Sequence, residues 1–480
     1  ENREPPPCSP PPWPHPTATW AQGPSEAGKS RLARALERLR NRGPDSTATW
    51  LGNCCALGNT RLAVQDLTSA GSLPMHAHGF SLAYNGEIYN FLELQSELKD
   101  LGYKFKSRSD SEVLLAGWHA WGEDLLPRLA GMFAFAIWDC AKSELILVRD
   151  RYGKKPLLYK NEDRSFSFSS ELAALEALSD SSPEIDTSAL RLLFTLRYIP
   201  EPLSISKNVA KLPGGHLLRY NRDGIHIKRW YIGAQEALSK YGNWQIASRD
   251  LVDKFDNAVS CRLISDVPVG VFLSGGIDSA LVASSMVRSI DKVRSFTVGF
   301  ENSTKYYEER PAAEKVAKYL NTEHTSIEIS PLDSQSALTD IFVGLDEPFA
   351  DSSAIPMYLL AREARKHVTV ALSGDGADEI FGGYRKYQGE LLASKYQSIP
   401  NILRRGLIEP LVNRFPESKD NPLSEKIRRL RRFVAHAGKD SIGRQIGWME
   451  LLNANERSEF FLEGEETFLL EKMLAKFRDE

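Results

Sequence analysis

A glycine turn between a predicted strand and a predicted helix constrains the fold of this chain more than any other feature. The turn is Ser274–Ser279, which follows the apolar run Val267–Leu273 and precedes the helical run Ala280–Val287. Glycines let the backbone approach a ligand closely, and amides at a helix N-terminus attract anions. A carboxylate such as Asp278 beside a polyphosphate usually means Mg²⁺. The segment therefore predicts a parallel α/β sheet with a pyrophosphate cradle.

The second half of the chain continues the alternation of strands and helices that this turn begins. From about residue 244 the predicted elements are Val269–Leu273, Ala280–Val287, Val293–Gly299, Pro311–Leu320 and His367–Leu372. This order is typical of a parallel sheet covered on both faces, in which ligands bind at the carboxyl ends of the strands. The second such end carries Ser373–Glu379, whose acids Asp375, Asp378 and Glu379 could hold a metal or orient a substrate. Taken alone, that segment could equally be a polar turn.

The first half of the chain has a different pattern of predicted strands and helices. From Trp50 to about Phe168 it is mostly short strands, interrupted by helices near Phe91–Leu101 and Ser111–Trp121, which predicts an α+β layered domain. Residues 171–230 are interpreted as a connector that ends in a hairpin, His216–Tyr231. We thus expect a disordered proline-rich segment over 1–24, a first domain over 25–230 with an atypical N-terminus, and a second domain over 244–480.

Composition narrows the classes of protein. Charged residues make up 26% of the 480 residues and the formal net charge is −3, which gives no electrostatic case for nucleic acid or an acidic membrane. No apolar run approaches the roughly 20 residues that span a bilayer. The five cysteines include no C-x-x-C pair, so neither a disulfide framework nor a zinc site is expected. A reducing, cytoplasmic location is the prediction.

Three short patterns in the first 110 residues have chemical interpretations. Asn85-Gly86 follows a strand and could form an oxyanion hole, although on its own Asn-Gly is more often a hairpin turn. Arg61 and Asp110 could clamp the carboxylate and ammonium of an amino acid, or be surface ions. Gly23–Ser30 matches the Walker A pattern, but no hydrophobic strand precedes it, so a working P-loop is not expected.

Together these segments resemble glutamine-dependent asparagine synthetases of the bacterial type, over roughly residues 35–440. The resemblance rests on long matches in both halves: Arg42–Asp45, Leu57–Ala63, Asn85–Asn90, Ser109–Val113, Gly131–Asp139, Arg149–Gly153, Val271–Ser279, Asp346–Ala354 and Ala371–Tyr384. It implies an Ntn-type (αββα) glutamine amidotransferase domain followed by an α/β parallel-sheet synthetase domain of the ATP-pyrophosphatase type. The implied reaction converts aspartate to asparagine through β-aspartyl-AMP, using ATP, Mg²⁺ and ammonia from glutamine.

The resemblance also assigns roles to residues. Glutamine would be bound by Arg61, Leu62, Ala63, Val64, Gln65, Asn85, Gly86, Glu87 and Asp110. Asn85 and Gly86 would form the oxyanion hole. ATP would be bound by Leu273, Ser274, Gly275, Gly276, Asp278, Ser279, Val298, Ser373 and Gly374. Asp278 and Asp375 would hold Mg²⁺, and Asp375 would assist formation of the acyl-adenylate. The family often dimerises, which leaves a homodimer open.

Two departures from the family pattern bear on the expected activity. The family's nucleophile is a cysteine at the start of the mature chain, whereas this sequence begins at Glu1 and its first cysteine, Cys8, is internal. The family also continues beyond the position of Glu480, so the second domain is expected to be C-terminally truncated. Two alternatives therefore stay open: an adenylating ligase that uses free ammonia or an internal amine, as β-lactam synthetases do, and a catalytically inactive binding module.

Overall fold

The computed structural model describes residues 26–162, 165–180, 182–233, 243–301, 308–415, 422–452 and 456–457. The predicted disordered segment 1–24 and Cys8 lie outside these residues. The chain divides into two compact units. The first comprises the residues up to Glu184, Glu201–Asp346 and Ile355–Ser373, and the second comprises Ile185–Pro200, Glu347–Ala354 and the residues from Gly374 onward.

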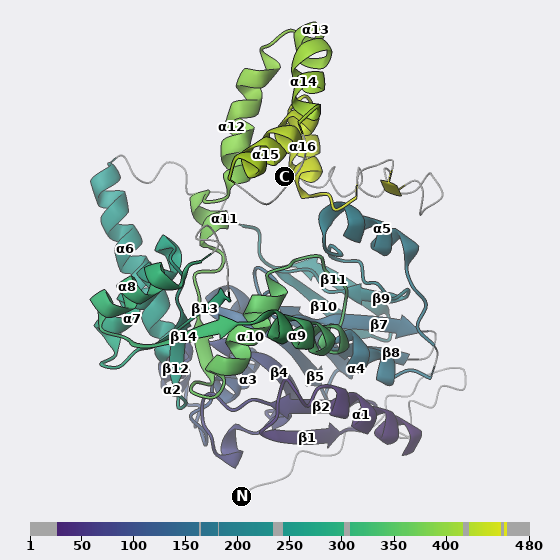
Figure 1. Ribbon diagram of the computed structural model, residues 1–480. Helices are drawn as coiled ribbons and strands as arrows, with labels where there is room; N and C mark the ends of the chain where they lie inside the picture. Colours follow the sequence, from purple (N-terminus) through teal and green to yellow (C-terminus); the bar gives the residue numbers. More distant parts are fainter. Residues whose placement is uncertain are drawn as a thin grey trace, which may run out of the picture. The chain divides into compact units, whose positions relative to one another are not determined.

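The centre of the first unit is a six-stranded antiparallel sheet (Figure 1). Its strands, in sheet order, are β11 (Gly224–Arg229), β10 (His216–Asn221), β6 (Glu144–Arg149), β5 (Gly131–Asp139), β4 (Phe80–Ile88) and β3 (Met75–Ala77). Every residue of β6 is buried, as are seven of the nine in β5. The predicted terminal hairpin is confirmed, but it is no appendage to a connector, because β10 pairs with β6 and extends this sheet.

Each face of this sheet is covered by a different layer. Leu82, Phe133 and Phe135 pack against helices α2 (Phe91–Asp100) and α3 (Asp110–Trp121). The opposite face, with Ala134 and Leu147, packs against side chains of a second layer of strands. That layer contains two small sheets, formed by β1 (Ser46–Leu51) with β2 (Ala56–Arg61), and by β8 (Ser165–Ser169), β7 (Leu158–Glu162) and β9 (Val209–Lys211).

Two helices pack outside the second layer and complete the predicted αββα order. They are α1 (Glu26–Arg38), which contacts β2, and α4 (Leu172–Ala177), which contacts β7 and β8. Helix α1 contains part of the Walker-like pattern. Its Lys29 forms an exposed ion pair with Glu26 in the first turn of the same helix. Lys29 and Ser30, the last two residues of the pattern, thus lie within α1, and the lysine is engaged at the protein surface.

The second layered structure of the first unit is a four-stranded parallel sheet, as predicted. Its order is β14 (Glu323–Ile329), β13 (Arg294–Phe300), β12 (Val269–Phe272) and β15 (Val370–Leu372). One face packs against α6 (Trp244–Ser260), α7 (Ile277–Ser289) and α8 (Arg310–Leu320), and the other against α9 (Pro331–Gly344) and α10 (Ala354–Ala364) (Figure 1). Successive strands run outward from β12 to β14, and β15 then returns to the other side of β12. The carboxyl ends of β12 and β15 therefore flank a topological switch point, where open α/β sheets bind ligands.

The second unit is helical throughout its described elements. These are α5 (Thr187–Leu196), α11 (Ala377–Phe381), α12 (Arg385–Gln397), α13 (Asn401–Leu403), a π-helical turn (Arg404–Ile408), α14 (Glu409–Asn413), α15 (Pro422–Ala437) and α16 (Ser441–Met449). Its core contains Ala393, Tyr396 and Val434. No helix in the described part of the chain has the length and hydrophobicity that crossing a bilayer requires.

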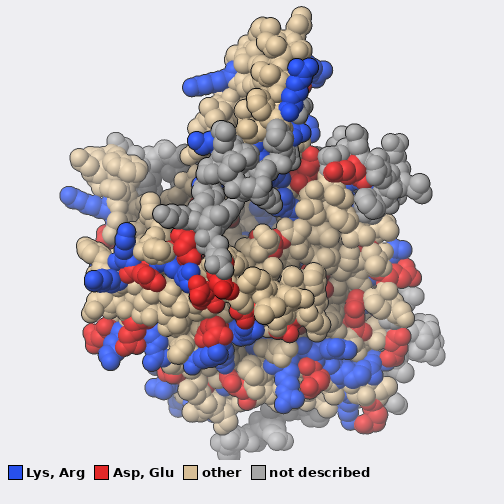
Figure 2. Space-filling model, in the orientation of Figure 1, with Lys and Arg blue, Asp and Glu red and all other residues tan. Residues whose placement is uncertain are grey.

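Charged side chains on the visible face of the first unit are mixed in sign. Figure 2 shows lysine and arginine interspersed with aspartate and glutamate over its lower part. Such a mixture gives this face no extended field of one sign, in keeping with the formal net charge of −3.

Candidate active site

The amides of strand β4 provide the first element of the candidate glutamine site. Tyr89 N–H donates to the Ala130 carbonyl of the neighbouring chain segment at 2.7 Å. Because such bonds alternate along an antiparallel pair, the N–H groups of Tyr84, Gly86 and Ile88 point away from β5. Strand β3 pairs only with Phe80–Leu82, so the Gly86 N–H points past its end.

The backbone amides two residues before and two residues after Gly86 donate hydrogen bonds to side-chain oxygens. Tyr84 N–H donates to Asn59 Oδ1 at 3.1 Å, and Ile88 N–H donates to Asp110 Oδ2 at 2.9 Å. Neither of these acceptors engages the Gly86 N–H between them. The interpretation of Asn85-Gly86 as a hairpin turn is therefore wrong, because both residues lie inside β4, opposite Ala134 and Phe133.

Two buried polar atoms beside these amides have no hydrogen-bond partner among the described residues. They are Asn85 Nδ2, a donor, and Gln65 Oε1, an acceptor. Gln65 is only 7% exposed, and its Nε2 donates to Glu87 Oε2 at 2.8 Å. Buried polar groups are nearly always paired in folded proteins. An unmet donor and an unmet acceptor in one region therefore suit a ligand that carries both kinds of group.

Arg61, at the end of β2, shapes the loop that contains Gln65. Its guanidinium donates to the carbonyls of Gln65 (2.9 Å), Asp66 (2.6 Å) and Thr68 (3.3 Å). In the same loop, Ala63 N–H donates to Asp45 Oδ2 at 2.8 Å. The predicted residues Arg61–Gln65 thus form one ordered loop. Arg61 serves as its internal brace here, with its donors directed at loop carbonyls.

Asp110 is buried at the beginning of α3, with 5% of its surface exposed. Its Oδ2 accepts from the Tyr84 hydroxyl at 2.7 Å and from Ile88 N–H at 2.9 Å. Burial raises the pKa of this carboxyl, and the bonds from Ile88, Tyr84 and Ser111 oppose that rise. Asp110 is therefore a candidate for binding a ligand, and its hydrogen bonds also join α3 to β4.

The Glu87 side chain interacts electrostatically with both Asp110 and Arg61. Burial raises its pKa to about 8, and the nearby Asp110 adds to the rise, while Lys155 and Arg61 oppose it. The pKa of Lys155 is lowered by burial and by Arg42. The structure thus brings Arg61 and Asp110 into the electrostatic environment of Glu87.

Replacing Glu87 with glutamine is expected to stabilise the protein increasingly as pH rises. The ordinary pKa of about 4.5 becomes about 8 on folding, so between these values only the unfolded state ionises fully and stability falls. Glu87→Gln cannot ionise and avoids this loss, which is on the order of a few kcal/mol at pH 8. Thermal unfolding midpoints measured across this range should diverge in favour of the variant. The exposed Glu93→Gln is the matched control, and parallel curves for Glu87→Gln and the unmodified protein would contradict the prediction.

The candidate ATP site begins at the carboxyl end of β12. Ser274 Oγ lies 2.9 Å from Ser279 Oγ and accepts from Gly276 N–H at 3.0 Å, and Ser274 N–H donates to Ser279 Oγ at 3.0 Å. These bonds fold the loop back over the start of α7, whose first turn contains Asp278. A Cβ on Gly275 would lie 2.8 Å from Ala312 Cβ, so α8 packs too closely for a larger residue. The predicted strand, glycine turn and helix are thus confirmed.

The other predicted ATP-site residues divide between the two units. Leu273 is buried and its N–H donates to the Phe296 carbonyl at 2.8 Å, while Val298 lies within β13. Ser373 directly follows β15, the strand that pairs with β12. Gly374 and Asp375 belong to the second unit. In that unit the Glu379 carboxylate accepts from the Tyr384 hydroxyl at 2.6 Å.

The donor set at the start of α7 suits magnesium bound together with phosphate. The described residues contain no group of three or more histidine, cysteine, aspartate or glutamate side chains that could hold a metal ion by themselves. Mg²⁺ is usually bound by one or two carboxylates plus substrate phosphates. Asp278, half-buried in the first turn of α7, fits that role.

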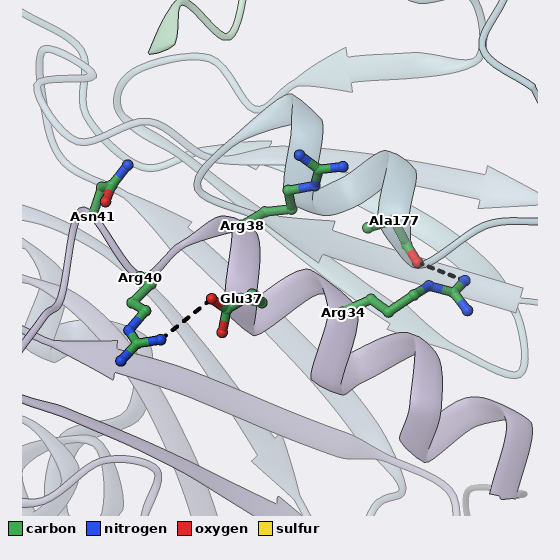
Figure 3. Close-up of a pocket in the computed structure, with 6 residues that line it drawn as sticks. All are labelled: Arg34, Glu37, Arg38, Arg40, Asn41 and Ala177. Atoms are coloured by element: carbon green, nitrogen blue, oxygen red, sulfur yellow. Dashed lines mark hydrogen bonds and ion pairs between the residues drawn. The ribbon is translucent and has the colours of Figure 1, made fainter. Parts of the chain in front are cut away.

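A cavity of about 640 Å³ has none of the predicted site residues in its lining. It is lined by Arg34, Glu37, Arg38, Arg40, Asn41 and Ala177 (Figure 3). Arg40 turns toward Glu37, 3.4 Å away, and Arg34 donates to the Ala177 carbonyl at 3.3 Å. The arginines diverge, so they do not form a common anion site.

Comparison with known proteins agrees with both halves of this description. A family model for a glutamine amidotransferase domain matches residues 18–231, and one for asparagine synthase matches residues 250–473. A Methanocaldococcus jannaschii relative in the asparagine synthetase family is 33% identical, and the match covers 79% of this chain and 77% of that relative. The chain belongs to the glutamine-hydrolysing asparagine synthetase family.

Other asparagine synthetases extend well beyond the match. Asparagine synthetase 1 of Bacillus subtilis is 36% identical over 384 residues, which cover 80% of this chain and 60% of that protein. A Mycobacterium bovis relative is 36% identical over 406 residues, which cover 81% of this chain and 62% of the relative. The chain thus spans about three fifths of the length of these two curated relatives.

Several residues that build the candidate glutamine site of this asparagine synthetase family member were not predicted individually. Asp45, Asn59 and Tyr84 bond to the predicted residues or their neighbours. Asp45 belongs to the matched segment Arg42–Asp45 and Asn59 to Leu57–Ala63, so the family pattern carried a signal for both. Asp266, which bonds to the loop from the other half of the chain, lay outside every matched segment.

Proposed function

We propose that this protein converts aspartate to asparagine, using ATP and ammonia released from glutamine. Membership of the asparagine synthetase family supports the proposal for both halves of the chain. The observation that carries it is the glycine loop Ser274–Ser279, which opens α7 at the switch point of a parallel sheet. A helix N-terminus in that position suits a polyphosphate.

In the amidotransferase half, the proposed work of the site is to bind glutamine and stabilise the oxyanion formed on its side-chain carbonyl. Asn85 Nδ2 and the Gly86 N–H are the donors for that oxygen, and water-free preorganised donors are most effective in this role. The Gln65 Oε1 and Asp110 acceptors suit the ammonium and amide N–H groups of the substrate. The family's nucleophile is an N-terminal cysteine, and Cys8 lies outside the described residues.

In the synthetase half, the aspartate β-carboxylate would attack the α-phosphorus of ATP and release pyrophosphate. Ammonia would then attack the acyl carbon of β-aspartyl-AMP and release AMP. The amides at the start of α7, with Ser274 and Ser279, are the proposed holders of the departing pyrophosphate. Asp278 and Asp375 are the proposed ligands of Mg²⁺, which when bound would neutralise that leaving group. Asp375 is further proposed to assist adenylation.

The nitrogen source tests this proposal directly. Pyrophosphate release is measured with ATP, Mg²⁺ and aspartate, in parallel reactions that contain glutamine, ammonium or neither. The proposal predicts release and asparagine formation with either donor. Release with ammonium alone would replace it with an ammonia-using ligase, and an absence of release in all reactions would favour a binding module.

A further inference from the structure

A short segment of the synthetase half touches the candidate glutamine site at two places. We call residues 262–266, which begin within the 3-10 turn Cys261–Leu263 after α6 and precede strand β12, the linking segment. It ends three residues before Val269, where β12 begins, and β12 leads directly to the Ser274 loop. A residue that hydrogen-bonds to the linking segment is therefore connected through it to β12 and to the Ser274 loop of the proposed ATP site.

The first contact is made by Asp266. Its backbone N–H donates to the Val64 carbonyl at 2.9 Å, and its Oδ2 accepts from Asp66 N–H at 2.8 Å. These two bonds clamp the loop around Gln65, the residue whose Oε1 has no partner among the described atoms. A hydrogen bond from a backbone N–H to a carboxylate is stronger than one to a neutral acceptor.

The backbone conformation of Asp66 is unfavourable and requires stabilising contacts. It is 4% exposed and has φ of 51°, a left-handed conformation that non-glycine residues seldom adopt. Its carboxylate accepts from Thr68 and from Arg108 N–H at 2.8 Å. Its N–H donates to Asp266, which lies outside the amidotransferase half, and to no other acceptor among the described residues. The loop's geometry thus depends on a residue of the other half.

The second contact is made by Arg262. Its guanidinium carbon lies 4.4 Å from the centroid of the Tyr89 ring, within the range of a favourable cation–π interaction. Tyr89 follows the end of β4, three residues after Gly86. The linking segment therefore contacts both the Gln65 loop and the chain just beyond the Asn85-Gly86 amides.

We propose that Asp266 is a positioning residue of the glutamine site, assisted by Arg262, so that the synthetase half sets the affinity for glutamine. This inference rests on the proposed function of the amidotransferase half. Asp266 is proposed to act through its hydrogen bonds to the Val64 and Asp66 backbone.

The experiment is a titration of the full chain with L-glutamine by calorimetry, or by initial rates of glutamate release where the preparation hydrolyses glutamine. Asp266→Ala should raise the Kd or KM for glutamine about tenfold, because the Asp66 N–H loses its acceptor. Asp266→Asn retains an acceptor oxygen and should stay within about twofold of the unmodified protein. Asp291→Ala, at an exposed aspartate of the same half, is the matched control.

Two further readouts separate positioning from general damage. Thermal unfolding shows whether Asp266→Ala is folded, and hydrogen exchange of the backbone over residues 62–66 should be faster in this variant than in Asp266→Asn. Equal glutamine affinity and equal exchange in Asp266→Ala and the unmodified protein would overturn the inference. If the unmodified protein binds no glutamine, the proposed function of this half fails, and the exchange comparison still decides whether Asp266 holds the loop.

Discussion

Gly86→Ala is expected to abolish most glutamine-dependent activity and to destabilise the protein. A Cβ at this position would lie 2.4 Å from the Met132 carbonyl oxygen and 2.8 Å from Phe133 Cα. Both are backbone atoms of β5, a buried central strand, so they cannot turn aside as a side chain could. Overpacking of this kind costs about 1–3 kcal/mol. The shift of β4 would also move the Asn85 and Gly86 donors, and a displacement near 1 Å costs about 100-fold in rate.

The measurement pairs the thermal unfolding midpoint with rates of asparagine formation from glutamine and from ammonium. Ammonium-dependent formation should fall much less than glutamine-dependent formation, because the proposed ATP site lies on another sheet. Gly344→Ala, at the end of α9, is the control, since a Cβ there would meet no atom within 4 Å. A Gly86→Ala protein with unchanged stability and unchanged use of glutamine would show that β4 and β5 do not approach as described.

Asp110→Ala should have the second large effect, a loss of about 3 kcal/mol in the free energy of unfolding. The substitution leaves the Tyr84 hydroxyl and Ile88 N–H buried without their acceptor, and each unsatisfied group costs about 1–3 kcal/mol. It also leaves a small cavity at the start of α3. Chemical denaturation, compared with the unmodified protein at one pH, measures the loss.

The variant Asp110→Asn separates this structural role from recognition of substrate. Tyr84 and Ile88 both donate to the same Asp110 oxygen, Oδ2, and an amide oxygen in that position can still accept both hydrogen bonds. We therefore expect it to retain most of the stability, yet to bind glutamine weakly because it lacks a charge for the ammonium group. Equal glutamine affinity in Asp110→Asn and the unmodified protein would contradict the assignment of Asp110 to substrate binding.

The strands that the sequence predicts best are those whose environment is uniform along their length. Strand β5 is an apolar run because both of its faces are covered, and β12 to α7 is marked by its glycine turn. Strand β14 was not predicted. It is an edge strand of the parallel sheet, and the solvent-facing positions Glu323 and Glu328 interrupt its apolar pattern. The hairpin of β10 and β11 could be predicted because hairpin signals are local, whereas the pairing of β10 with β6 could not, because those strands are distant in the sequence.

The candidate glutamine site shows the same division. Asn85, Gly86 and Asp110 could be named from short motifs and a family resemblance. The bonds that hold them could not, because Asn59, Asp45 and Asp266 are separated from their partners by 25, 18 and 200 residues. Nothing in local composition indicates which distant acceptor an amide will meet. The structure adds that Arg61 braces its own loop, whereas the sequence suggested a direct clamp on the ligand's carboxylate.

The identity of the nucleotide products tests the central claim most directly. The protein is incubated with ATP, Mg²⁺, aspartate and ammonium, and the nucleotides and phosphates are separated by chromatography. Adenylation of aspartate predicts equal amounts of AMP and pyrophosphate, formed only when aspartate is present. Formation of ADP and orthophosphate, or of AMP at the same rate without aspartate, would contradict the account.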